Sequence, residues 1–103
     1  MFKLSIYVPE NEKENLKKSL FKAGAGKYKN YDRCCWETKG TGQFRPLPGS
    51  NPYIGKQNTL EKVREFKIEI IFENILLDKI IEVIKNTHPY EEPAYQIIKL
   101  IKP

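Results

Sequence analysis

Hydrophobic and polar positions change their spacing along the chain, and each spacing predicts a secondary-structure element. Residues 2–8 alternate between hydrophobic and polar side chains, which predicts a half-buried strand. Apolar residues then recur at helical intervals, and the pair Asn11 and Glu14 has the spacing of a capping box, which predicts the start of a helix. Gly24 and Gly26 are expected to end it, because glycine accepts the left-handed conformation common after a helix.

The middle of the chain predicts one strand and one long loop. Residues 31–39 are expected to form the second strand, with Cys34, Trp36 and Thr38 on one face. Residues 40–58 are rich in glycine and proline and are expected to be irregular. A loop of that length in so small a domain is usually functional or serves assembly, so candidate binding residues are sought in it.

The last third repeats the plan of the first. Residues 65–72 alternate and predict a third strand, and Asn74 is a candidate cap for a helix whose apolar positions reach residue 84. The His88-Pro89 pair is expected to end that helix, because the residue before a proline is disfavoured in helical geometry. Residues 95–101 predict the last strand.

The predicted order of elements is β-α-β-β-α-β, which indicates an α+β protein. The economical packing of this order is a ferredoxin-like domain, in which a four-stranded antiparallel sheet carries two helices on one face. The other face is expected to present Tyr7, Ile71 and Ile98. An apolar sheet face of this kind favours oligomerisation.

Length and composition limit the class of protein. The chain has 103 residues and a mass of 12.1 kDa, which fits a single domain over residues 1–103. No apolar run approaches the roughly 20 residues that a membrane-spanning helix needs, and the N-terminus lacks the layout of a signal peptide. We therefore expect a soluble, cytoplasmic protein with no membrane association.

The net charge of +5 raises the question of nucleic acid, but the pattern of charges does not favour it. Acidic residues are interleaved with the basic ones, whereas nucleic-acid-binding proteins concentrate cations on one stripe. The third predicted strand also lacks the glycine and aromatic pattern of an RNA-recognition strand. No nucleic-acid partner is expected.

Reactive side chains are few. Cys34 and Cys35 are adjacent, which suits neither a structural disulfide nor a four-ligand zinc site, so we expect them to pack as small hydrophobic residues in a strand. His88 is the only histidine, and no serine or cysteine near it completes a nucleophile–base–acid set. The sequence therefore predicts that the chain is not an enzyme.

The segment His88-Pro89-Tyr90-Glu91-Glu92-Pro93-Ala94-Tyr95 is the most distinctive stretch. The imidazole of His88 and the carboxylates of Glu91 and Glu92 are ligand types that suit a divalent metal, Zn²⁺ or Cu²⁺. Alternatively, the two prolines build a rigid turn in which the tyrosines pack and a glutamate accepts hydrogen bonds from the backbone. The turn is the favoured interpretation, and the metal remains the second.

Four stretches occur in a specific order and spacing: Gly24-Ala25-Gly26 followed by Tyr31 and Cys34, GTGQFRP at residues 40–46, NPYIG at residues 51–55, and HPYEEPAY at residues 88–95. Together they resemble the PII/CutA-like domain inserted in bacterial NIF-three-like (YqfO-type) proteins, here expected to stand alone. The resemblance implies a ferredoxin-like fold and a homotrimer with its sheets packed inward. It supplies no reaction, because the dinuclear metal site of those proteins belongs to two flanking lobes.

The predicted function is that of a non-enzymatic, trimeric binding module with a regulatory role. Its ligand, a divalent metal or another small molecule, is expected in clefts between subunits. The metal ligands would be His88, Glu91 and Glu92, and the other candidate lining residues are Gly40, Gly42, Phe44, Arg45, Asn51, Tyr53, Gly55 and Tyr90. The alternatives are a structural module that binds an unknown protein partner, and an accessory cap for a metal-dependent hydrolase.

Overall fold

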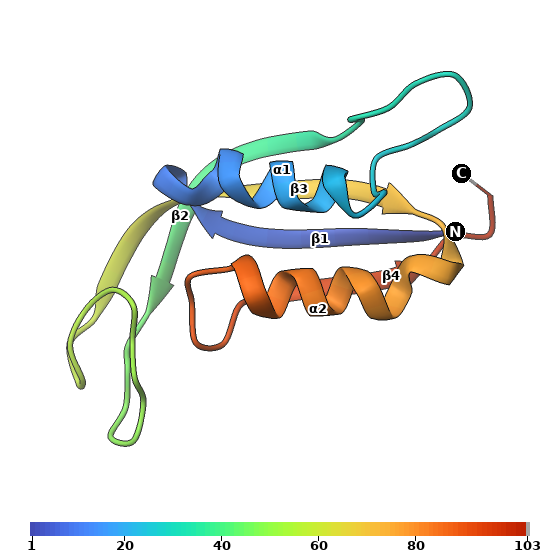
Figure 1. Cartoon of the computed structure of the whole chain (residues 1–103). Coiled ribbons are helices and arrows are strands. Elements are labelled where there is room, and N and C mark those ends of the chain that lie inside the picture. Colours follow the sequence, from blue (N-terminus) through green and yellow to red (C-terminus); the bar gives the residue numbers. More distant parts are fainter. Residues whose placement is uncertain (103) are drawn as a thin grey trace.

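A computed structural model describes residues 1–102 and confirms the α+β, ferredoxin-like architecture (Figure 1). Its strands are β1 (Phe2–Pro9), β2 (Trp36–Phe44), β3 (Glu61–Phe72) and β4 (Tyr95–Lys99), and its helices are α1 (Lys13–Lys22) and α2 (Leu77–Thr87). The four strands form one antiparallel sheet in the order β2-β3-β1-β4. The two helices lie side by side over one face of it.

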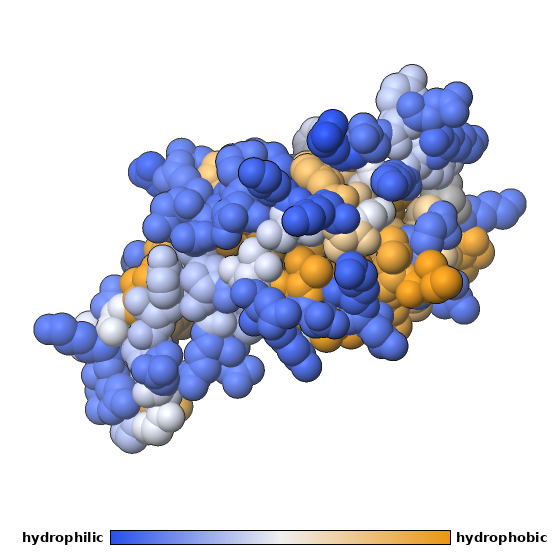
Figure 2. Space-filling model, viewed as in Figure 1, coloured by the Kyte–Doolittle hydropathy of each residue, from blue (hydrophilic) through white to orange (hydrophobic). Residues whose placement is uncertain are grey.

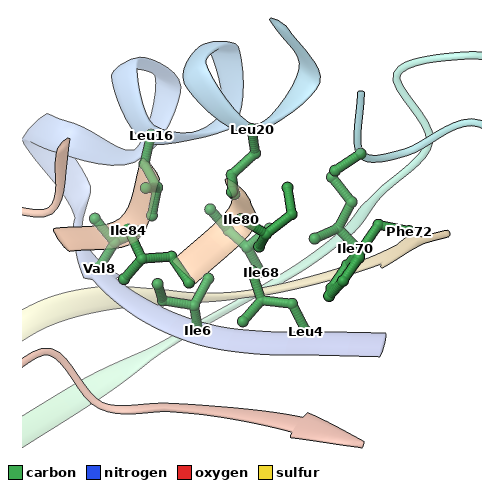
Figure 3. Packing of buried hydrophobic residues seen from close by; sticks show 11 residues of the cluster. Leu4, Ile6, Val8, Leu16, Leu20, Ile68, Ile70, Phe72, Ile80 and Ile84 are labelled. Carbon is green, nitrogen blue, oxygen red and sulfur yellow. The ribbon is translucent and has the colours of Figure 1, made fainter. Parts of the chain in front are cut away.

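The core lies between that face and the helices. Alternation in β1 and β3 directs every second side chain toward the helices, and α1 and α2 return leucines and isoleucines to the same layer (Figure 3). The core consists of Leu4, Ile6, Val8, Leu16, Leu20, Ala25, Ile68, Ile70, Phe72, Ile80 and Ile84. On the outer surface of the helical layer, hydrophobic residues gather near the start of α2, where Ile75 is exposed (Figure 2).

The helix starts differ from the capping prediction. Short 3₁₀ turns, η1 (Glu10–Glu12) and η2 (Asn74–Leu76), precede the two α-helices. Asn11 and Asn74 lie inside these turns, and no side-chain cap closes any of the four helix starts. The capping predictions were therefore wrong, because the chain enters each helix through 3₁₀ geometry, which places the asparagines before the first α-helical turn.

The second and third strands are displaced from their predicted positions. β2 begins at Trp36 rather than residue 31 and runs to Phe44, while β3 begins at Glu61 rather than residue 65. Nine residue pairs, from Trp36↔Glu69 to Phe44↔Glu61, join the two strands. The hairpin therefore extends beyond the helices, and the irregular stretch is shorter than residues 40–58 (Figure 1). β4 likewise ends at Lys99, two residues before the predicted end.

The cysteines lie just before β2 and not within a strand. Both thiols are free and half-buried. Cys35 packs against the core as predicted, whereas the thiol of Cys34 donates to the carbonyl of Asp32 at 3.6 Å. Burial raises the pKa of the Cys35 thiol, and the nearby ammonium of Lys17 opposes that effect.

The sheet face opposite the helices is more polar than expected. The register places Tyr7, Ile71 and Ile98 on it, as predicted, together with Trp36. Charged residues share the same face, and the ammonium of Lys3 pairs with the carboxylate of Glu69 at 2.7 Å. The open face thus combines isolated hydrophobic side chains with ion pairs.

Candidate ligand-binding site

The projecting hairpin and the 88–94 turn enclose a cavity of about 700 Å³. The turn reaches this place because β4 pairs only with residues 2–6 of β1, and the N–H of Tyr7 donates instead to the carbonyl of Ala94 at 3.2 Å. The wall consists of Tyr7, Thr41, Gly42, Gln43, Phe44, Arg45, Pro46, Leu47, Ser50, Pro52, Tyr53, Ile54, Glu65, Tyr90, Glu91, Glu92 and Ala94. Segments far apart in the sequence therefore form one concave surface.

Tyr90 is the centre of the polar and aromatic contacts in this wall. Its hydroxyl donates to Oε2 of Glu65 on β3 at 2.7 Å. Its ring centroid lies 5.9 Å from that of Phe44 and 6.2 Å from that of Tyr53, with tilted geometry. Burial and the Glu65 carboxylate together raise the pKa of the Tyr90 phenol well above its usual range, so it keeps its proton at neutral pH.

His88 holds the turn in place from below. Only 7% of the residue is exposed, and its ring lies 5.0 Å from that of Tyr90 between centroids. Nε2 lies 2.7 Å from the carbonyl oxygen of Tyr7, and Nδ1 accepts the N–H of Tyr90 at 3.1 Å. The neutral tautomer with its proton on Nε2 satisfies both bonds, so the imidazole joins the turn to β1.

The predicted metal ligands do not converge. Both ring nitrogens of His88 are bonded to the backbone, and Oε1 of Glu91 accepts the N–H of Asn51 at 3.0 Å. Within residues 1–102, no group of three histidine, cysteine, aspartate or glutamate side chains could hold a metal ion. The arrangement of a single chain therefore does not fit Zn²⁺ or Cu²⁺ at His88, Glu91 and Glu92, and it agrees with the interpretation of the segment as a turn.

Comparison with known proteins identifies where such a domain occurs. No family model matches the chain. It is 43% identical over 100 residues to a GTP cyclohydrolase 1 type 2 homolog of Halalkalibacterium halodurans, covering 97% of this chain and 27% of that protein. A protein related to NIF3 from Bacillus cereus superposes with a TM-score of 0.83 at 37% identity, over 98% of this chain and 26% of that one. In sequence and fold, the chain matches one domain of NIF3-related proteins.

The chain spans about a quarter of the length of these NIF3-related relatives. CutA1 from Pyrococcus horikoshii, at 18% identity, has a TM-score of 0.71 and is covered to 86%, with all of this chain aligned. The PII-like protein CutA from Nostoc sp. PCC 7120, at 13% identity, gives 0.70 over 98% of this chain and 82% of that one. These likenesses confirm the PII/CutA-like fold.

The location of the chain is less constrained than its fold. None of the helices within residues 1–102 is long and apolar enough to cross a membrane. One structural neighbour, the divalent cation tolerance protein CutA from Archaeoglobus fulgidus, is described as periplasmic. The cytoplasmic location of the present chain stays a prediction.

The cavity brings together most of the residues that the motifs of this NIF3-related domain suggested. Seven of them line it: Gly42, Phe44, Arg45, Tyr53, Tyr90, Glu91 and Glu92. Asn51 contributes a backbone bond to Glu91, and Gly40 lines a smaller neighbouring cleft of about 220 Å³. Gly55 packs closely on the side chain of Glu61, and His88 lies beneath Tyr90. The binding roles of all these residues stay predictions.

Two wall residues escaped the motif analysis. Glu65 and Tyr7 lie on neighbouring strands, and both side chains face away from the helices. Strand alternation could have assigned that face to each of them, since Phe66 and Val8 beside them point inward. Their proximity to Tyr90 depends on the path of the 88–94 turn, which no spacing in the sequence reveals.

Gly42→Ala is expected to break the Tyr90–Glu65 hydrogen bond while leaving the fold intact. A methyl group at residue 42 would overlap the Glu65 carboxylate, which is the mobile end of a flexible side chain and can move away. The pKa of Tyr90 then moves down toward that of an ordinary tyrosine, because a neighbouring carboxylate raises it. NMR titration of ¹³Cζ-labelled tyrosine measures this shift.

Gly40→Ala is the matched control on the same strand and face, because a methyl group there meets nothing within 4 Å. Equal behaviour of the two variants would contradict the placement of Glu65 against Gly42. Unchanged Tyr90 titration in Gly42→Ala would contradict the hydrogen bond.

The histidine predicts a loss of stability on acidification. Burial lowers the pKa of His88 below 6.5, and this effect exceeds the opposing influences of the Tyr7 carbonyl, Glu65 and Glu12. A depressed pKa contributes stability that is complete above the unfolded value of 6.5 and is lost as the pH falls through the folded value. Each unit of depression corresponds to about 1.4 kcal/mol.

Urea unfolding at pH 7.5 and at pH 5 measures this loss. His88→Gln keeps an amide donor but cannot titrate, so its dependence on pH over that interval is expected to be weaker. An identical pH dependence in the variant would assign the effect to other groups.

Proposed function

We propose that the chain is a non-enzymatic PII-like module that binds a small ligand in the cavity between the β2–β3 hairpin and the 88–94 turn. The single observation that carries this proposal is the cavity itself. Its volume of about 700 Å³ is within the range of small-molecule sites. Aromatic and apolar residues form most of its wall, with a few polar groups directed into it, which is the usual composition of such sites.

The chemistry of the wall supports binding rather than catalysis. The hydroxyl of Tyr90 donates to Glu65 and its raised pKa keeps the phenol protonated, so it is a poor base at neutral pH. Both ring nitrogens of His88 are bonded to backbone groups. These groups stiffen the cavity, and a stiff cavity lowers the conformational cost of binding.

We extend the proposal to a homotrimer that buries the open sheet face. The PII/CutA-like resemblance implies this assembly, and the hydrophobic side chains of Tyr7, Trp36, Ile71 and Ile98 on that face support it. The outer edges of β2 and β4 are unpaired within the chain and could also meet a neighbour. Because the cavity opens beside the sheet face, ligand binding would regulate the assembly or a partner of it.

A protein-interaction module is the second candidate. Tyr31 is 73% exposed and Trp36 is 69% exposed, and they lie close together in sequence before and at the start of the edge strand. Aromatic side chains of this kind are enriched where proteins meet. In this case an unknown protein partner would occupy the surface and the cavity would hold no ligand.

Native mass spectrometry of the chain alone and with zinc, copper or ATP tests the proposal. The expected result is a trimer near three times 12.1 kDa that retains a small-molecule adduct. Tyr53→Ala is expected to lose the adduct, whereas Tyr31→Ala, outside the cavity, retains it. A monomer would overturn the trimer, and a bare chain under all conditions would favour the interaction module. A zinc adduct lost in Glu91→Ala would restore the metal hypothesis.

A further inference from the structure

The cavity wall has a charge opposite in sign to that of the whole chain. The chain carries a net charge of +5, yet the charged wall residues are three glutamates and one arginine, a net of −2. These residues are Glu65, Glu91, Glu92 and Arg45. Within residues 1–102, none of the three carboxylates forms an ion pair, although seven other acidic residues and pairs elsewhere are engaged by lysine or arginine.

The existing contacts leave that negative charge available. Glu65 accepts the hydroxyl of Tyr90, and Glu91 accepts the backbone N–H of Asn51. Both donors are neutral, so they orient the carboxylates without cancelling their charge. An occupant that brings positive charge would therefore be favoured, and an anion such as a carboxylate or phosphate would be repelled.

Aromatic rings surround the same space. The rings of Phe44 and Tyr53 are inclined to that of Tyr90 by 59° and 51°, so the three rings form adjoining walls rather than a flat stack. The face of an aromatic ring attracts a cation within about 6 Å of its centroid, and several such faces around one cation are the arrangement that recognises quaternary ammonium groups. An apolar wall also favours alkyl substituents on the cation over a hydrated metal ion.

We propose that the ligand of this cavity is a small organic cation, an alkylated ammonium whose methyl groups contact Phe44, Tyr53 and Tyr90 while its charge faces the glutamates. This inference rests on the proposed function, because it names the chemical class of ligand for the same cavity. It separates three classes that the cavity volume alone leaves equal: cations, anions and neutral apolar molecules.

Choline and 3,3-dimethylbutan-1-ol distinguish charge from shape, because they share a branched, methylated head and differ in its charge. Amide NMR spectra of the labelled chain, recorded during titration with each, report binding at the Asn51 and Tyr90 N–H groups. Choline is expected to give saturable shifts there, and its affinity is expected to be about tenfold greater than that of the neutral alcohol.

Variants assign the two contributions. Glu92→Gln is expected to weaken choline binding about threefold to tenfold without affecting the alcohol. Glu82→Gln, on the exposed side of α2 and outside the cavity, should bind choline as the parent chain does. Tyr53→Leu keeps an apolar side chain but removes one ring face, so choline affinity should fall while the alcohol is retained. Tyr53 is largely exposed in a loop, so the fold is expected to survive this change.

The outcomes separate the two proposals. Equal binding of choline and the alcohol would overturn the cation inference and leave a small-molecule site in place. Binding of neither, with an adduct retained in native mass spectrometry, would do the same. Binding of neither without any adduct would overturn both. Choline that dissociates an oligomer would assign the site to a lysine or arginine of a second copy, which would overturn the small-molecule form of the inference.

Discussion

Replacing Ile80 with alanine is expected to destabilise the fold by about 2–5 kcal/mol, the cost of deleting most of a buried isoleucine. Ile80 is 0% exposed and points from α2 into the layer formed by β1 and β3 (Figure 3). The change removes hydrophobic contacts and leaves a cavity that tightly packed neighbours fill only partly. A domain of this size has a total stability of about 5–15 kcal/mol, so a large share of it would be lost.

Ile75→Ala is the matched control. Ile75 lies one turn before α2 and is 91% exposed, so the same chemical change there removes almost no buried contact. Its effect is expected to stay within about 0.5 kcal/mol. Urea unfolding followed by circular dichroism measures both variants at equal temperature and pH. Similar losses of stability in the two would contradict the placement of the core between the sheet and α2.

The fold could be predicted because its core elements carry their own periodicity. The alternation in residues 2–8 and 66–72 arises from one buried sheet face, and the apolar residues of α2 follow the helical repeat for the same reason. Burial selects the residue type at each of these positions. The β-α-β-β-α-β order, and with it the sheet and its helical layer, therefore follows from the sequence.

The hairpin arms could not be predicted in the same way, because burial does not shape them. Residues 40–44 of β2 lie beyond the helices, include two glycines and are mostly exposed. Their strand conformation is stabilised by backbone pairing with β3, from Gly40↔Glu65 to Phe44↔Glu61. Such pairing depends on the partner strand and leaves little pattern in the residues themselves.

The motifs indicated the cavity but not its chemistry. The 40–46, 51–55 and 88–95 stretches all contribute to the wall, so their shared role could be anticipated. The function of His88 could not, because its two backbone bonds arise only when the turn crosses β1 at Tyr7. The same crossing brings Tyr90 to Glu65. Tertiary contacts thus convert a candidate metal-binding histidine into a structural one.

Gly26→Ala is expected to cost about 3 kcal/mol, because a left-handed backbone disfavours a side chain and a buried site resists added volume. Gly26 has φ +80°, and a methyl group there would lie 2.8 Å from the carbonyl oxygen of Cys34 and 3.0 Å from the ring of Phe21. Its own backbone is committed on both sides, since its N–H donates to Ile71 and its carbonyl accepts the N–H of Cys34, each at 2.8 Å. The clash therefore cannot be relieved without loosening the connection from α1 to β2.

Two further glycine variants separate backbone conformation from crowding. Gly49 has φ +96° with nothing within 4 Å of an added methyl group, so Gly49→Ala should cost only the conformational share, about 1–2 kcal/mol. Gly40 has neither a left-handed φ nor a close neighbour, so its alanine variant should be near neutral. Thermal unfolding of the three variants should rank Gly26→Ala as least stable and Gly40→Ala as most stable. Because only Gly26 joins α1, β3 and the start of β2, equal losses at Gly26 and Gly49 would show that the connection around residue 26 yields to a methyl group.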